Sequence, residues 1–94
     1  MPVIARTITA KGVERKVKPA DGKRFSLAEL QKHVGGYVTL IAIKDGEDRA
    51  LMYVDEDGMP KKLPINRTAT KFFMRSGGQY PIVGKVLIVA PGQS

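Results

Sequence analysis

Residues 26–54, SLAELQKHVGGYVTLIAIKDGEDRALMYV, carry the signals of a helix and then of a hairpin, and they decide the fold class. Ser26 and Glu29 have the spacing of a capping box, in which each side chain accepts a hydrogen bond from a free backbone N–H at the start of a helix. A Gly-Gly pair that begins at Gly35 ends the pattern, because glycine tolerates the positive φ of a helix C-cap. The sequence therefore predicts a helix over residues 27–34.

The apolar residues of this helix lie on one side. Phe25 and Leu30 hold the positions of a hydrophobic staple, which packs across the first turn. Leu27, Leu30 and Val34 form an apolar stripe at helical spacing. The stripe predicts one buried helix face.

The hairpin signal follows the helix. Residues 37–43 are apolar on both alternating faces, a pattern typical of a central strand that is covered on both sides. Asp45-Gly46 favours a turn, and residues 49–54 are expected to form the antiparallel partner strand. The acidic run of residues 55–58 is typical of a turn that closes this second strand.

Three further strands are predicted outside this hairpin. Residues 3–8 and 13–18 show period-two patterning, and Gly12 permits the turn between them. The second of these strands has a wholly charged face and Arg15 on its other face, which suits the edge of a sheet. Residues 84–90, GKVLIVA, are apolar on both faces.

A second helix is expected to begin after Asn66, a favoured N-cap residue. Ala69, Phe72 and Phe73 repeat at helical spacing behind it and should pack on the sheet. A chain of 94 residues can bury one core, so we predict a single α+β domain over residues 1–94. Its order is β-β-α-β-β-α-β, with a mainly antiparallel or mixed sheet and two short helices.

The composition, with 43% hydrophobic and 27% charged residues, is typical of a folded globular domain. Cysteine is absent, which excludes disulfides and zinc–thiolate sites and fits a reducing compartment. The start of the sequence lacks a signal-peptide pattern, and no apolar run approaches the roughly 20 residues of a membrane span. We therefore expect a cytoplasmic protein without a membrane partner, and no cofactor is indicated.

The formal net charge of +7 is unevenly distributed. Residues 1–24 hold seven Lys or Arg and two acids, residues 25–60 hold three and seven, and residues 61–94 hold six and none. If the fold brings the two basic ends together, they form a positive face that attracts an anionic partner. The alternative is a charged surface that only keeps the protein soluble.

The acidic run does not match a calcium site. Asp55, Asp57 and Gly58 resemble part of a calcium loop, but Pro60 and Asn66 stand where that loop needs its glycine and its bidentate glutamate. No metal site is predicted.

His33, the only histidine, lies near the end of the first predicted helix, where the helix dipole favours a protonated ring. Glu29, four residues earlier, could pair with it on the surface. No serine or cysteine constellation accompanies the histidine, so we expect no enzymatic activity. The glycine pairs follow a helix or precede a strand, whereas a phosphate-binding loop precedes a helix.

The start of the second predicted helix is the best candidate for anion binding. Free N–H groups point out of a helix N-terminus, and basic residues gather around Asn66. The alternative is a capped helix without a ligand. The residues assigned to partner or anion binding around this helix are Lys61, Lys62, Asn66, Arg67, Lys71 and Arg75. Arg15 and Lys16, in the predicted strand of residues 13–18, are assigned to the same role.

Four motifs within residues 25–90 carry a family resemblance. They are Gly35-Gly36-Tyr37, the run Asp55 to Gly58, the helix start with Leu63, Pro64, Asn66, Ala69 and Thr70, and the closing run with Ile82, Val83, Gly84 and Val86. In this pattern the chain resembles a family of small domains of unknown function that is common in bacteriophages, plasmids and other mobile elements. The resemblance transfers no catalytic residue.

The resemblance and the small size imply a non-enzymatic accessory protein of a phage or another mobile element. Such a protein is expected to bind a host protein in the host cytoplasm, for example to inhibit an antiviral defence system. The alternative is a nucleic-acid or nucleotide-binding module that uses the basic N- and C-terminal regions. The lack of tryptophan and the seven acids of residues 25–60 favour protein binding.

Overall fold

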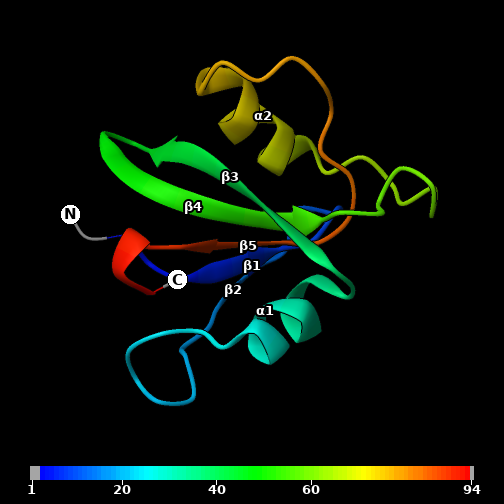
Figure 1. Cartoon of the computed structure of the whole chain (residues 1–94). Helices are drawn as coiled ribbons and strands as arrows, with labels where there is room; N and C mark the ends of the chain where they lie inside the picture. The colour runs from blue at the N-terminus through cyan, green and yellow to red at the C-terminus, as the bar shows by residue number, and fades with distance from the viewer. Residues whose placement is uncertain (1–2, 94) are drawn as a thin grey trace.

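In the computed structural model, which describes residues 3–93, one antiparallel sheet lies between two helices (Figure 1). The strands stand side by side in an order that differs from their order along the chain. The last strand lies between two hairpins and joins them into one sheet, in the order β2-β1-β5-β4-β3. The elements are β1 (Arg6–Ile8), β2 (Glu14–Lys16), α1 (Leu27–Val34), β3 (Val38–Asp45), β4 (Asp48–Asp55), α2 (Arg67–Arg75), β5 (Val86–Val89) and a short 3-10 helix, η1 (Pro91–Gln93).

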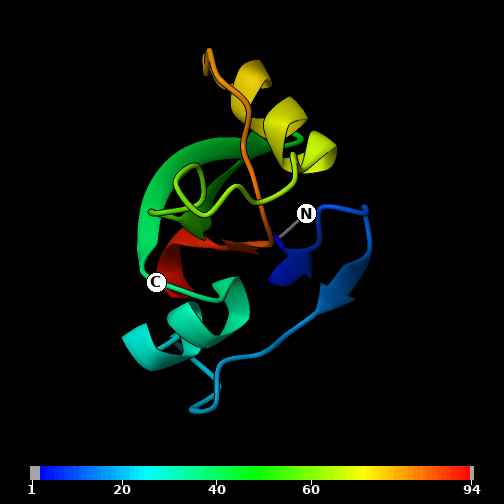
Figure 2. The same cartoon turned by 90° about the vertical axis from the view of Figure 1, so that its right-hand side faces the viewer.

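The two faces of the sheet carry separate hydrophobic cores, and Figure 2 shows α1 and α2 on opposite sides of the sheet. The α2-side core consists of Ile8, Ile43, Ala50, Met52, Val54, Ala69, Ile82, Val86 and Ile88. The α1-side core consists of Ala5, Phe25, Leu30, Val34, Tyr53, Leu87 and Val89. Successive residues of β5 alternate between the two cores and are fully buried, which confirms the prediction of a two-faced apolar strand.

The capping box of α1 is confirmed. Ser26 Oγ accepts a hydrogen bond from the backbone N–H of Glu29 (3.2 Å), and a carboxylate oxygen of Glu29 accepts one from the N–H of Ser26 (2.9 Å). Gly35 is the C-cap, with φ of 95°. Gly36 has a different role, because a Cβ at that position would lie 2.6 Å from Nζ of Lys61. The second glycine therefore makes room for a side chain of another segment.

The predicted N-cap Asn66 is confirmed, and it also fastens α2 to the sheet. Its Oδ1 accepts a hydrogen bond from the N–H of Ala69 (3.0 Å). Its Nδ2 donates to the carbonyl oxygens of Ile8 and Gly84, each at 2.9 Å. The residue is fully buried, so one amide group connects α2, β1 and the segment that leads into β5.

The structure corrects two expectations about packing. The strand predicted to be central, residues 37–43, is β3, and β3 lies at an edge of the sheet because β5 and β4 take the interior positions. Leu27, expected in the packed stripe of α1, is 62% exposed, and Phe25 joins Leu30 in the α1-side core instead. β1 and β2 are shorter than predicted. Neither α1 nor α2, nor any other helix in residues 3–93, is long and apolar enough to cross a membrane.

Candidate protein-binding edge

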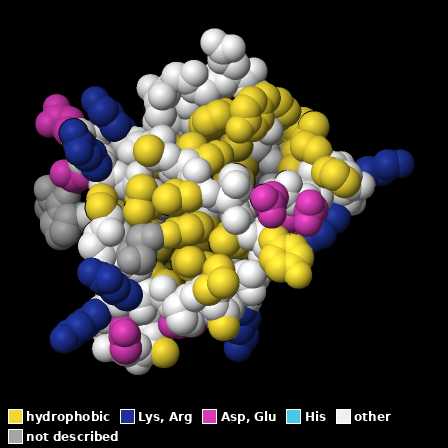
Figure 3. Space-filling view, in the orientation of Figure 1, with side chains coloured by type: hydrophobic (Ala, Val, Ile, Leu, Met, Phe, Trp, Pro, Cys, Tyr) yellow, Lys and Arg dark blue, Asp and Glu magenta, His cyan; other side chains and the backbone are white. Residues whose placement is uncertain are grey.

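The outer side of β3 is an uncharged edge of the sheet over residues 38–43. β3 pairs with β4 along its whole length, and no strand within residues 3–93 lies on its other side. Its residues 38–43 are uncharged, yet Thr39 and Ala42 are exposed and Leu40 is 52% exposed. Figure 3 shows hydrophobic side chains gathered across the centre of this side of the molecule, with charged side chains around the margin.

The register of the hairpin fixes which backbone groups of β3 face outward. Asp45 pairs with Asp48 across the turn, and in an antiparallel ladder hydrogen-bonded pairs alternate with non-bonded ones. Lys44 accordingly turns its N–H away from β4 and donates it to Oγ of Ser76 (3.1 Å). By the same alternation, the outward backbone groups at the remaining positions belong to Val38, Leu40 and Ala42.

No described residue forms a hydrogen bond with these outward groups of β3. The opposite edge strand, β2, is different, since Glu14, Arg15 and Lys16 are all exposed and charged. Charged side chains protect a sheet edge from pairing with other chains, and an apolar edge without them is a template for another strand. The prediction that residues 13–18 form an edge strand is confirmed, whereas the open edge at β3 was missed.

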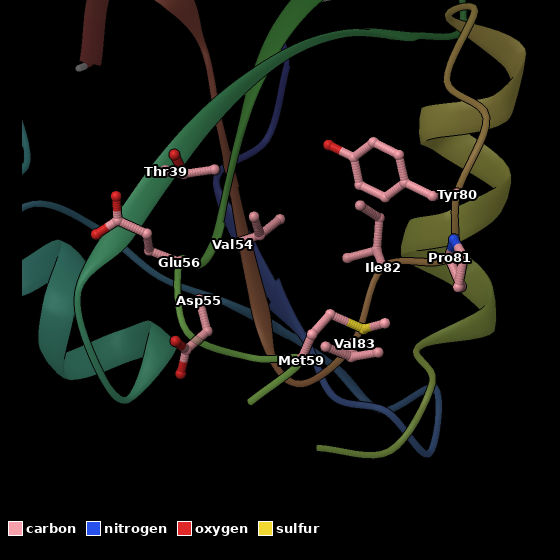
Figure 4. A pocket seen from close by; sticks show the side chains of 9 residues that line it. All are labelled: Thr39, Val54, Asp55, Glu56, Met59, Tyr80, Pro81, Ile82 and Val83. Atoms are coloured by element: carbon pink, nitrogen blue, oxygen red, sulfur yellow. The ribbon is translucent and has the colours of Figure 1, made fainter. Parts of the chain in front are cut away.

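A pocket of about 160 Å³ lies next to β3 on the side of the sheet that carries α2. Figure 4 shows Thr39 on one side of this pocket and Tyr80 on the other, with Val54 and Ile82 between them. The ring of Tyr80 packs edge-on against Phe73, with 4.7 Å between the ring centroids. The complete lining is Thr39, Val54, Asp55, Glu56, Met59, Tyr80, Pro81, Ile82 and Val83.

A second, wider hollow of about 640 Å³ lies at the other end of β3. Ala42 and Lys44 of β3 line it together with Leu51 of β4 and Pro91 of η1. Arg75, one of the predicted partner-binding residues, also contributes to its wall. The open edge of β3 is therefore flanked by a hollow at each end.

The two acids of the 160 Å³ pocket differ in their partners. Asp55, expected in a turn, is the last residue of β4, and its side chain is only 2% exposed. Its carboxylate pairs with Nζ of Lys61 (2.8 Å) and accepts a hydrogen bond from the N–H of Asp57 (2.8 Å). Glu56 is exposed, and its carboxylate has no ion-pair partner among the described residues. Glu56 is therefore the acid that can meet a cation from outside.

The predicted basic residues do not form one continuous face. Arg67, Lys71 and Arg75 are exposed at successive four-residue steps of α2, so they share one helix face. Arg15 and Lys16 are neighbours on β2, at the opposite edge of the sheet from β3, and their side chains alternate between its two faces.

Lys61 and Lys62 lie in the loop that precedes α2. Nζ of Lys61 forms an ion pair with the carboxylate of Asp55, although the lysine side chain stays partly exposed. Lys62 adopts a left-handed backbone conformation with φ of 57°. The amide of Asn66 is fully buried and bonded on both its oxygen and its nitrogen, so a direct side-chain contact with a partner is not open to it.

The sequence predicted an environment that favours the protonated ring of His33, whereas the structure places the ring where the neutral form is favoured. Burial lowers the pKa of the ring, the charges of Lys85 and Lys32 lower it further, and Glu29 opposes the shift. Glu29 does not form the expected surface pair, since its carboxylate accepts hydrogen bonds from the N–H groups of Ser26 and Ala20. Within residues 3–93, no group of three or more His, Cys, Asp or Glu residues is arranged to hold a metal ion.

One family comparison matches nearly the whole chain. The family described as Domain of unknown function (DUF3846) matches residues 7–94, so its extent includes β2 and all of β1 except Arg6, as well as the motifs of residues 25–90. The comparisons with curated proteins and with solved structures gave no match.

Proposed function

We propose that this chain, which belongs to the DUF3846 family of domains of unknown function, is a non-enzymatic module that binds an extended segment of a partner protein at β3. The observation that carries the proposal is the unpaired outer side of β3, where the backbone groups of Val38, Leu40 and Ala42 lie in an uncharged stretch. Main-chain hydrogen bonds supply the affinity of such strand addition, and pockets for alternate side chains supply its specificity.

The charges around β3 favour a different protein over a second copy of this chain. If two copies paired antiparallel through β3 about a two-fold axis, Glu56 of each copy would lie near the other copy's hairpin turn. That turn carries the exposed acid Glu47, so an acid would meet an acid at both ends of the interface. The net charge of +7 on each copy adds repulsion at longer range.

The proposal includes a biological setting. The protein belongs to a bacteriophage, plasmid or other mobile element, acts in the host cytoplasm, and binds a host protein to counter an antiviral defence system. The sequence motifs shared with small domains of mobile elements support this setting, together with the small size of the chain.

The test of the binding mode is a proline at Ala42. Its N–H faces away from β4, so Ala42→Pro removes a donor from the open edge without removing a ladder hydrogen bond. Ala42→Thr is the matched control, because threonine keeps the N–H and suits a strand. Affinity capture from host lysate is expected to recover the same protein with the wild type and Ala42→Thr, and to lose it with Ala42→Pro.

Two controls accompany this capture. Far-UV circular dichroism checks that Ala42→Pro is folded, and Leu40→Lys provides a second edge variant that keeps every backbone N–H. A partner that binds both edge variants as well as it binds the wild type contradicts strand addition at β3. A wild-type dimer that Ala42→Pro converts to monomer contradicts the choice of a different protein.

The second candidate is a nucleic-acid-binding module, favoured by the face of α2 that carries Arg67, Lys71 and Arg75. Phosphate contacts by these cations would make the affinity fall steeply between about 50 and 200 mM salt. Fluorescence polarisation with labelled DNA and RNA tests this candidate, and the triple alanine variant should reduce both the affinity and its salt dependence. Failure of the wild type to bind at about 50 mM salt rules it out.

A further inference from the structure

We infer that the partner segment of this domain runs antiparallel to β3 and carries an apolar side chain followed, two residues later, by Lys or Arg. This inference rests on the proposed function, because it assumes that a strand adds to the outer side of β3. It specifies the chemistry of the partner from the pocket and the charge that lie next to that side.

The pocket determines the apolar position. The side chain of Thr39 lies on the same face of the sheet as the pocket, and it is the only β3 residue that lines it. A residue that pairs opposite Thr39 places its Cβ about 4.5–5.5 Å from that of Thr39, within reach of the pocket for a long side chain. Threonine is short and exposed, so it leaves the entrance open.

The size and lining of the pocket fit one apolar side chain. Val54, Ile82 and Val83 are buried, while Met59 and Tyr80 are 66% and 57% exposed at its rim. Its volume of about 160 Å³ is close to that of the engineered apolar cavity of about 150 Å³ that binds benzene in another protein. A leucine, methionine or phenylalanine side chain is the expected occupant. Its binding would remove from water both its own apolar surface and that of Met59 and Tyr80.

Glu56 determines the basic position. The N–H of Glu56 donates to the carbonyl oxygen of Tyr37 (2.8 Å), so Glu56 lies beside the residue that precedes β3. Figure 4 shows its carboxylate on the β3 side of the pocket, on the far side from Tyr80. The neighbouring acid, Asp55, is already neutralised by Lys61. Among the described residues, Glu56 is therefore the acid of this pocket whose carboxylate has no ion-pair partner and can pair with a cation of the partner segment.

The direction of the segment sets the order of the two residues. In an antiparallel pairing, the residue opposite Thr39 is followed two residues later by the residue opposite Tyr37, on the same face. The apolar residue then precedes the basic one. Antiparallel pairing is favoured because every pairing in this sheet is antiparallel and because it is slightly more stable per residue.

The test is selection of binding peptides from a displayed library of random sequences, followed by measurement of Kd for synthetic peptides. The enriched peptides are expected to share the order apolar, any residue, Lys or Arg. Thr39→Phe fills the pocket entrance and is expected to weaken binding at least about tenfold. Glu56→Gln is expected to weaken it about two- to fivefold, whereas Glu47→Gln, at an exposed acid in the hairpin turn, should leave it unchanged.

A charge reversal makes the test sharper. Glu56→Lys is expected to shift the selected residue from Lys or Arg to Asp or Glu while the apolar position stays the same. Peptides that lose binding with Ala42→Pro but lack the shared order, or that tolerate Thr39→Phe, overturn the inference and leave strand addition intact. No enriched peptide, or peptides that bind Ala42→Pro as well as the wild type, overturn the proposed function itself.

Discussion

Replacement of Asn66 by alanine is expected to destabilise the domain far more than the loss of an ordinary helix cap. The cap itself is worth about 1 kcal/mol. The substitution also removes the donor to two carbonyl oxygens, those of Ile8 and Gly84, at a fully buried position. Each buried acceptor without a partner costs about 1–3 kcal/mol, so the cap and the two acceptors together give about 3–7 kcal/mol. That is a large part of the roughly 5–14 kcal/mol expected for a domain of this size.

The assay is urea unfolding followed by circular dichroism, with the free energy of unfolding obtained by linear extrapolation. Ser26→Ala is the matched control, since Ser26 caps α1 at an exposed position and should cost only about 1 kcal/mol. Asn66→Asp separates the two roles of the amide. Aspartate caps a helix as well as asparagine does, but its buried carboxylate would face two carbonyl oxygens without a proton to donate.

We expect Asn66→Asp to destabilise the domain at least as much as Asn66→Ala. If instead Asn66→Ala costs about 1 kcal/mol and Asn66→Asp is neutral, Asn66 is only a cap. The connection through its amide between α2, β1 and the segment before β5 would then contribute nothing measurable to stability.

Two further predictions concern glycine and histidine. Gly84 and Gly22 both have φ of 79°, but a Cβ at Gly84 would lie 2.7 Å from Cδ1 of Leu63, whereas at Gly22 it would meet open space. Urea unfolding should therefore show that Gly22→Ala costs about 1–2 kcal/mol and that Gly84→Ala costs slightly more, because only the end of the Leu63 side chain must shift; a lower cost for Gly84→Ala would contradict this contact. Burial and the charge of Lys85 lower the pKa of His33 from its ordinary value of 6.5, so the unfolded chain binds the proton more readily. Stability should be complete above that value and fall as the pH drops through the lowered pKa of the folded state, and the loss should be smaller in His33→Asn. An NMR titration of the His33 ring that gives a pKa above 6.5 would contradict the assigned environment.

The elements of this fold were predictable because their signals are local. The capping box of Ser26 and Glu29 and the N-cap Asn66 gave helices that start where the structure has them. The order of the strands was not predictable in the same way, since the β1–β5 and β4–β5 pairings join residues far apart in the sequence. The hydrogen bonds from the Asn66 amide to the carbonyl oxygens of Ile8 and Gly84 were not predictable either. They require the β1–β5 pairing, which brings these two residues together.

The candidate site is where the local pattern and the tertiary structure disagree. Residues 38–43 have the composition of a strand covered on both sides, yet within residues 3–93 their strand has a neighbour on one side only, and Leu40 is half exposed. In natural proteins the local residue pattern usually agrees with the tertiary environment, and the exceptions are often functional sites. β2 in the same sheet shows the usual solution, an edge of exposed charges. The contrast between the two edges within one domain supports the proposal of a partner strand at β3, since a charge at Leu40 or Ala42 would protect that edge as charges protect β2.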